Sequence, residues 1–93
     1  MNLHALTDGA IAGTGIIKLT GSTGTFGGAL ITSDGNTATV VIRKDSETGK
    51  KLFDIAVTSS AFIPMPVDIE QAVQLHYSIT GTNALAQLYE WVS

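Results

Sequence analysis

The glycines between two hydrophobic runs are the residues whose type and spacing first suggest chemistry. The stretch from Ile16 to Ile31 places Gly21, Gly24 and Gly27 at three-residue intervals after an apolar run. Such a loop can hold the pyrophosphate of a nucleotide, because glycines let backbone N–H groups approach it and a following helix N-terminus attracts the anion. The spacing therefore raises a nucleotide-binding hypothesis that requires a helix directly after the loop.

This stretch resembles the strand–TGxxGxxG–helix opening of atypical short-chain dehydrogenases, with Arg43 near the position of their phosphate-binding arginine. The helix would have to lie between Gly28 and Thr37. That segment contains Ser-Asp-Gly-Asn, which is typical of a turn, and a glycine inside a helix costs about 1 kcal/mol relative to alanine. We therefore interpret residues 21–28 as a loop between two strands and keep a nucleotide-binding fragment as a remote alternative.

No other group of polar residues has the spacing of a reactive site. His4 and His76 are far apart in strand-like segments, and His76 falls on the polar side of its segment. Asp34 begins a stretch like a calcium loop, but the later oxygen ligands are missing. Asp68 and Glu70 fit a solvated edge better than a cation site. The sequence therefore predicts no catalytic residue, no cofactor, no metal and no enzymatic activity.

Composition narrows the class of protein further. The 93 residues are 44% hydrophobic and 14% charged, the opposite of the balance that keeps chains disordered. The net charge is −3 with only five lysines and arginines, which disfavours binding to nucleic acid. Cysteine is absent, so a disulfide, a thiolate nucleophile and a zinc–sulfur site are excluded.

Neither a membrane span nor a secretion signal is predicted. The first nine residues have no basic segment followed by a long apolar run, and no stretch approaches the roughly 20 apolar residues of a spanning helix. We expect synthesis in the cytoplasm and no association with a membrane.

The clearest element is a β-hairpin in the middle of the chain. Thr37–Arg43 and Leu52–Thr58 both alternate apolar and polar residues with the two-residue period of half-buried strands. The residues between them are polar, and we expect Gly49 to close the turn with a positive φ.

Further short strands are predicted on both sides of this hairpin, separated by turn residues. Ser33–Asn36 is interpreted as a hairpin turn of the Asp-Gly kind, and Ser59–Pro66 as a connection, because proline cannot donate to a ladder. The pattern predicts an all-β fold: one domain over residues 1–93, a small antiparallel β-sandwich, jelly-roll-like, of about seven or eight short strands. The other predicted strands cover residues 3–6, 16–20, 29–32, 72–80 and 84–92.

Two apolar segments are candidates for a protein–protein interface. Phe62, Ile63 and Met65 lie in the proline-containing connection. Tyr89 and Trp91 share one side of the last strand, and Leu88 and Val92 lie on its other side. Such a strand is either central in a thin domain or covered by a neighbouring subunit, and packing in the core is the competing interpretation.

The order of elements as a whole resembles small β-sandwich structural proteins of tailed-phage virions. The resemblance implies a non-enzymatic virion component, either a capsid decoration (cement) protein that bridges shell subunits or a head-fibre or tail accessory protein. It also implies a homo-oligomer, possibly a trimer, with the major capsid protein or another virion protein as partner and the virion as location. The matching segments are Gly15–Thr20, Thr37–Gly49, Lys51–Val57, Ile63–Pro66, Gln74–Thr82 and Leu88–Trp91.

A second functional class stays open beside this one. Tyr77, Tyr89 or Trp91 could form a stacking platform in a carbohydrate- or receptor-binding β module of a tail or fibre.

Overall fold

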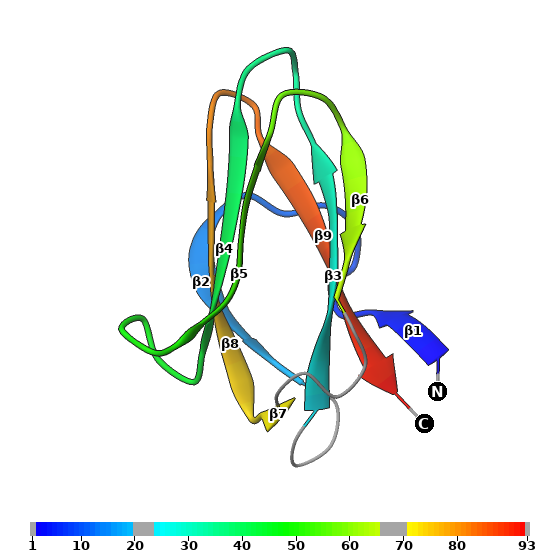
Figure 1. Ribbon diagram of the computed structural model, residues 1–93, viewed down its shortest axis with the longest axis vertical. Helices are drawn as coiled ribbons and strands as arrows, with labels where there is room; N and C mark the ends of the chain where they lie inside the picture. The colour runs from blue at the N-terminus through cyan, green and yellow to red at the C-terminus, as the bar shows by residue number, and fades with distance from the viewer. Residues whose placement is uncertain (1, 20–23, 66–70, 93) are drawn as a thin grey trace.

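The chain folds into two antiparallel β-sheets packed face to face (Figure 1), in a computed structural model that describes residues 2–19, 24–65 and 71–92. These residues contain no helix, and so none that could cross a membrane. The prediction of a small antiparallel β-sandwich is confirmed. The described residues form nine strands, which are β1 (Asn2–Ala5), β2 (Gly13–Lys18), β3 (Gly24–Thr32), β4 (Ala38–Lys44), β5 (Lys51–Val57), β6 (Ala61–Pro64), β7 (Gln71–Ala72), β8 (Gln74–Thr80) and β9 (Leu85–Val92).

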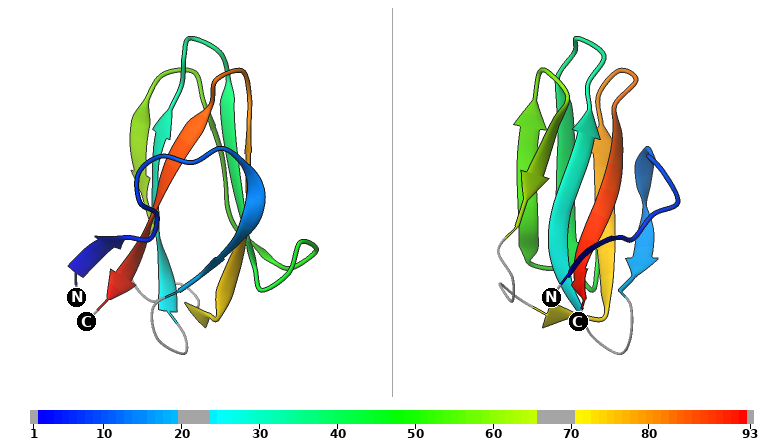
Figure 2. Two further views of the ribbon diagram at one scale, coloured as in Figure 1. Left: turned by 180° about the vertical axis from the view of Figure 1, so that it is seen from behind. Right: turned by 90° about the vertical axis from the view of Figure 1, so that its right-hand side faces the viewer.

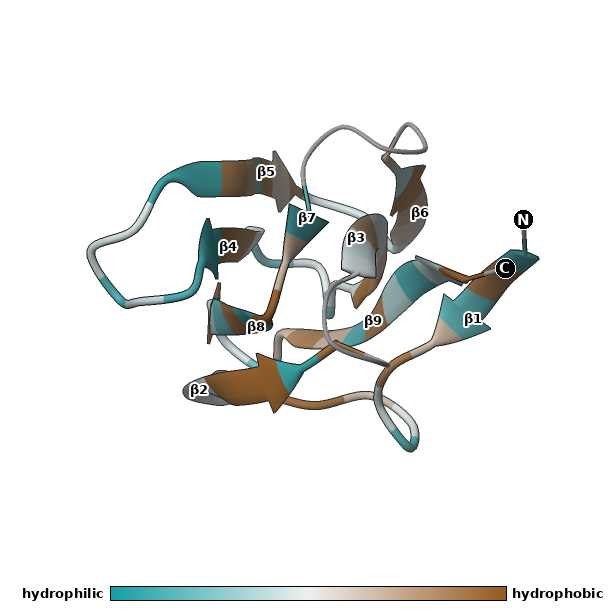
Figure 3. Cartoon of the chain, turned by 90° about the horizontal axis from the view of Figure 1, so that it is seen from below, coloured by the Kyte–Doolittle hydropathy of each residue, from teal (hydrophilic) through white to brown (hydrophobic). Residues whose placement is uncertain are grey.

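The strand order is that of a jelly roll. Sheet A has the order β1-β9-β3-β6, with the two-residue β7 also pairing with β3, and sheet B has the order β2-β8-β4-β5. With β7 set aside, the eight remaining strands form the two four-stranded sheets of a double Greek key. Figure 3 shows the two sheets as layers, and the right-hand view of Figure 2 shows β6, β3 and β9 of sheet A side by side.

The predicted central hairpin is confirmed, but its turn is built differently. β4 and β5 pair from Ala38 with Val57 onward, and the register shifts after Ile42. Asp45, not Gly49, takes a positive φ, of 63°. Gly49 is required for another reason: a Cβ there would collide with the carbonyl oxygen of Lys44.

Residues 24–28, predicted to be loop, belong instead to strand β3. Gly28 has a φ of 122°, and the register shifts between Phe26 and Gly28. Gly27 and Gly28 therefore form a bulge inside the strand. A Cβ on Gly28 would run into the carbonyl oxygen of Ile63 in the neighbouring strand. The helix required by the nucleotide-binding hypothesis is therefore a strand here, while residues 20–23 lie outside the described residues.

Two connections were also predicted wrongly. Ala61–Pro64 forms β6 and pairs with β3, which is possible because Pro64 ends a strand at the edge of a sheet. The Ser33–Asn36 segment is not a hairpin turn, because β3 and β4 belong to different sheets. This segment crosses from sheet A to sheet B, and Gly35 within it has a φ of 77°.

The core lies between the sheets and draws on both. Phe26 of β3 and Phe53 of β5 meet edge to face with ring centroids 5.4 Å apart. Among the described residues, every buried side-chain nitrogen or oxygen has a hydrogen-bond partner. The buried apolar residues are Leu19, Phe26, Ala29, Ile31, Ala38, Val40, Ile42, Phe53, Ala72, Leu75, Ile79, Ala84, Ala86 and Leu88.

The segment between β1 and β2 closes one side of the sandwich. It follows β9 first, through hydrogen bonds from Leu6 N to Leu88 O and between Ile11 and Ala86 in both directions. Thr7 is buried, and its Oγ1 accepts a hydrogen bond from Leu88 N. The chain then crosses to sheet B as β2.

Candidate functional site

Among the residues that the structure describes, those on the outer side of sheet A, called the sheet A face below, carry no charged side chain. The strand register identifies the members of this face, because two residues paired on neighbouring strands lie on the same side of the sheet. No aspartate, glutamate, lysine, arginine or histidine is among them. The face consists of Leu3 and Ala5 of β1, Leu85, Gln87, Tyr89 and Trp91 of β9, Thr25, Gly28, Leu30 and Thr32 of β3, Phe62 and Pro64 of β6, and Gln71 of β7.

Aromatic side chains connect the two strands that flank β3. The rings of Phe62 and Tyr89 meet edge to face at 5.4 Å, although β6 and β9 lie on opposite sides of β3. Trp91 Nε1 donates a 2.8 Å hydrogen bond to the carbonyl oxygen of Met65, which follows β6. Both contacts pass over β3 at its bulge, where Gly28 has no side chain. Contacts within the chain therefore fix the positions of these aromatic side chains.

Three large aliphatic or aromatic side chains remain open to solvent on this face. Leu30 and Phe62 are each 40% exposed, and Leu85 is 37% exposed. Leu30 lies between Phe62 and Gln87 in the paired register, so the exposed groups are neighbours rather than scattered. Contiguous exposed apolar surface on a small protein is typical of an interaction site.

The five interface residues predicted from the sequence divide between this face and the core. Phe62, Tyr89 and Trp91 lie on the sheet A face. Ile63 and Met65 are partly buried and pack against the core. The sequence did not identify Leu3, Leu30 and Leu85 as part of the same surface. No signal in the sequence separates Leu30 from Ala29 and Ile31, because all three are apolar, and only the structure shows that Leu30 alternates with buried residues.

The outer side of sheet B, called the sheet B face, is polar by contrast. Four of its residues are charged, and Lys51 and Asp54 form a 2.9 Å ion pair there. Its members are Thr14, Ile16 and Lys18 of β2, Gln74, His76, Ser78 and Thr80 of β8, Thr39, Val41 and Arg43 of β4, and Lys51, Asp54 and Ala56 of β5.

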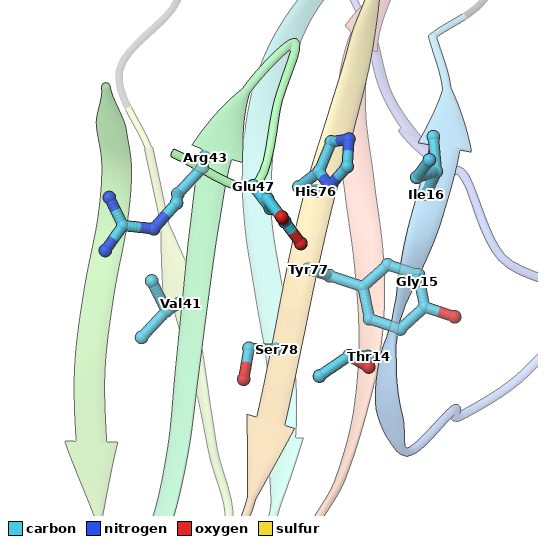
Figure 4. A pocket seen from close by; sticks show the side chains of 9 residues that line it. All are labelled: Thr14, Gly15, Ile16, Val41, Arg43, Glu47, His76, Tyr77 and Ser78. Carbon is cyan, nitrogen blue, oxygen red and sulfur yellow. The ribbon is translucent and has the colours of Figure 1, made fainter. Parts of the chain in front are cut away.

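A hollow of about 370 Å³ opens on the sheet B face (Figure 4). The small side chains of Thr14 and Ser78 lie opposite each other on β2 and β8. Ile16 and His76 form the next pair along the same two strands. Glu47, from the β4–β5 turn, extends over β8 beside His76 in Figure 4. The hollow is lined by Thr14, Gly15, Ile16, Val41, Arg43, Glu47, His76, Tyr77 and Ser78.

The β4–β5 turn that carries Glu47 is anchored at two points. Arg43 Nη1 donates a 3.0 Å hydrogen bond to the carbonyl oxygen of Gly49. Asp45 Oδ1 accepts hydrogen bonds from the backbone N–H groups of Val73 and Gln74, at 3.1 and 3.2 Å. Glu47 is thus held over the sheet by contacts that do not use its own carboxylate.

The remaining sequence candidates do not converge on a site. Asp34 Oδ2 accepts a 3.0 Å hydrogen bond from Asn83 Nδ2, which ties two loops together. Asp68 and Glu70 lie outside the described residues. Within the described part of the chain, no group of three or more acidic or histidine side chains could hold a metal ion.

Tyr77, Tyr89 and Trp91 do not form one stacking platform. Tyr89 and Trp91 belong to sheet A, whereas Tyr77 belongs to sheet B and lies against Gly15 of β2. No family model, curated protein or solved structure matches the chain.

Proposed function

We propose that the chain is a non-enzymatic structural protein that joins other protein subunits through its sheet A face. The observation that carries this proposal is the charge-free surface around Leu30, Phe62 and Leu85. Burying charge in an interface costs several kcal/mol per ion unless each charge is paired, and this face avoids that cost. Aromatic side chains such as Tyr89 and Trp91 are also enriched in the buried centres of interfaces.

The size of the face predicts what kind of contact it makes. Four strands about 4.8 Å apart and eight residues of about 3.4 Å along β9 give a projected area of at most roughly 500 Å². Two copies would then bury about 1,000 Å², the lower limit for a specific interface. Self-association through this face alone is therefore weak, and stable assembly needs several contacts at once, as in a trimer or on a regular shell.

Capsid decoration is a role that accounts for both the uncharged sheet A face and its small area. The jelly roll is a fold used by viral capsid domains, and the order of elements resembles that of small phage virion proteins. We therefore place the chain on a phage virion, as a cement protein that bridges the major capsid subunits or another virion protein. Repeated attachment sites on a shell would compensate for the small area of each contact.

Sedimentation velocity of the full chain over a wide concentration range, with and without intact capsids, tests this function. We expect weak, concentration-dependent self-association and stable co-sedimentation with capsids. A strict monomer at high concentration that also fails to sediment with capsids would contradict the proposal. A glycan-binding role without assembly would appear as binding to sugars by that monomer.

A further inference from the structure

We propose that the hollow on the sheet B face binds a neutral sugar. The hollow is separate from the sheet A face, because sheets A and B form the two opposite layers of the sandwich (Figure 3). A chain that docks through sheet A leaves the hollow facing outward. This binding function goes beyond assembly and does not depend on it.

The shape of the hollow reflects a pair of small residues next to a pair of larger ones. Thr14 and Ser78 are paired on β2 and β8, and the larger Ile16 and His76 form the next pair on the same outer side of these strands. Its volume of about 370 Å³ is near the low end of the roughly 300–1,000 Å³ typical of small-ligand sites. The ligand is therefore small, or is the end of a longer molecule.

The polar groups in the hollow match hydroxyl groups on a ligand. The hydroxyls of Thr14 and Ser78 each donate and accept, and the His76 ring does both when neutral. The carboxylate of Glu47 accepts only, and its two oxygens can receive two neighbouring hydroxyl groups. A sugar hydroxyl also donates and accepts, so it can satisfy every one of these partners.

Charge and apolar surface favour a neutral ligand. In Figure 4 the Arg43 side chain points away from Glu47 toward β5, and its Nη1 donates to Gly49 O. An anionic ligand would meet the Glu47 carboxylate, and an ammonium group would leave the donors of His76 and the hydroxyls without acceptors. Ile16 is 57% exposed at the rim, where the C–H side of a sugar ring can cover it.

Chemical-shift mapping of the full chain tests the inference. Glucose, galactose, mannose and N-acetylglucosamine would be titrated singly, with inorganic phosphate and ethanolamine as charged probes. We expect at least one neutral sugar to shift amide signals of Thr14, Ile16, Glu47, His76 and Ser78. No shift with any sugar, shifts confined to sheet A, or tighter binding of phosphate or ethanolamine would overturn it.

Two conservative variants and one control sharpen the result. Glu47→Gln replaces one acceptor oxygen with a donor NH2 group, and Thr14→Val removes a hydroxyl group, both with little change of shape, so each should weaken sugar binding about tenfold. Asp54→Asn removes a negative charge from the same face without touching the hollow and should leave affinity unchanged. Equal loss in all three variants would contradict a site in the hollow.

A glycan array then distinguishes a free sugar from the end of a surface polysaccharide. Binding of the free sugar alone and binding of glycans with that sugar at the terminus both support the site, whereas binding only to internal units contradicts it. Sedimentation of the same variants should be normal, since none of them alters the sheet A face.

Discussion

The outer faces of the two sheets rest on the same core but carry opposite chemistry. The sheet A face is uncharged and holds Leu30, Phe62 and Leu85 in the open, with two aromatic contacts crossing β3. The sheet B face carries lysine, arginine and aspartate side chains around a polar hollow. Because the inward side chains of each strand form the core, the outward side chains can differ between the two sheets without changing it. This difference is the basis of our two proposals, protein contact through the sheet A face and a small ligand in the hollow of the sheet B face.

The largest loss of stability is expected from substitutions in the core, to which both sheets contribute buried side chains. Leu88 of sheet A and Leu75 of sheet B are both fully buried on the inner side. Replacing either by alanine should lower the free energy of unfolding by about 2–5 kcal/mol, from lost burial and the cavity left behind. Chemical denaturation measures both. A loss below 1 kcal/mol for only one of them would mean that the sheets do not share a single core.

Replacing a glycine by alanine should cost more stability in sheet A than in sheet B, although less than the loss of a core leucine. Gly28→Ala in sheet A should cost about 1–3 kcal/mol, because φ is 122° and the new Cβ meets the backbone of Ile63. Gly15→Ala in sheet B places a Cβ within 2.5 Å of the Tyr77 hydroxyl, which is the movable end of a side chain. Thermal unfolding should therefore show the greater loss for Gly28→Ala, and the reverse order would contradict the described bulge.

The aromatic framework of the sheet A face should contribute about 1 kcal/mol. Trp91→Phe keeps a ring but removes the hydrogen bond to the Met65 carbonyl, a change of about 0.5–1.5 kcal/mol. Tyr89→Phe is the matched control, since it removes only a 3.2 Å bond to Gln87 of the same strand. Urea unfolding should rank Trp91→Phe as the more destabilising change; equal midpoints would argue against the contact across β3.

The smallest effect is expected on the sheet B face. The Lys51–Asp54 ion pair is about half exposed on both sides, and such pairs contribute only about 0–1 kcal/mol. Lys51→Met should change stability by no more than that at low salt, and the difference should vanish at high salt because exposed charges are screened. A loss that persists in high salt would show that this face is more than a solvated surface.

Sequence patterns predicted the sandwich and its central hairpin because both depend on local alternation. Ala38, Val40 and Ile42 repeat every second residue, and the structure buries all three. The glycines of residues 24–28 misled the prediction, since glycine usually marks a loop. Here all three lie inside β3, and Gly27 and Gly28 form a bulge because β6 approaches closely, which no local pattern reveals.

The sheet A face could be predicted only in part. Tyr89 and Trp91 were recognisable from their shared side of one strand. Phe62 lies in a strand that was not predicted because Pro64 is within it and Pro66 follows it in the sequence, and Leu3 and Leu30 come from strands that meet β9 only in the folded sheet. The hollow on sheet B was not predicted either, because it joins residues of β2, β8 and the β4–β5 turn.

The central claim, that the sheet A face is the contact surface, is tested most directly by two matched variants. Leu30→Glu and Ile16→Glu make the same chemical change at exposed positions, 40% and 57% exposed, on opposite faces. Sedimentation velocity and capsid co-sedimentation would be compared for both. We predict that Leu30→Glu loses self-association and capsid binding at unchanged stability, while Ile16→Glu self-associates and binds capsids like the natural chain. Loss of association in Ile16→Glu, or normal association in Leu30→Glu, would contradict the account.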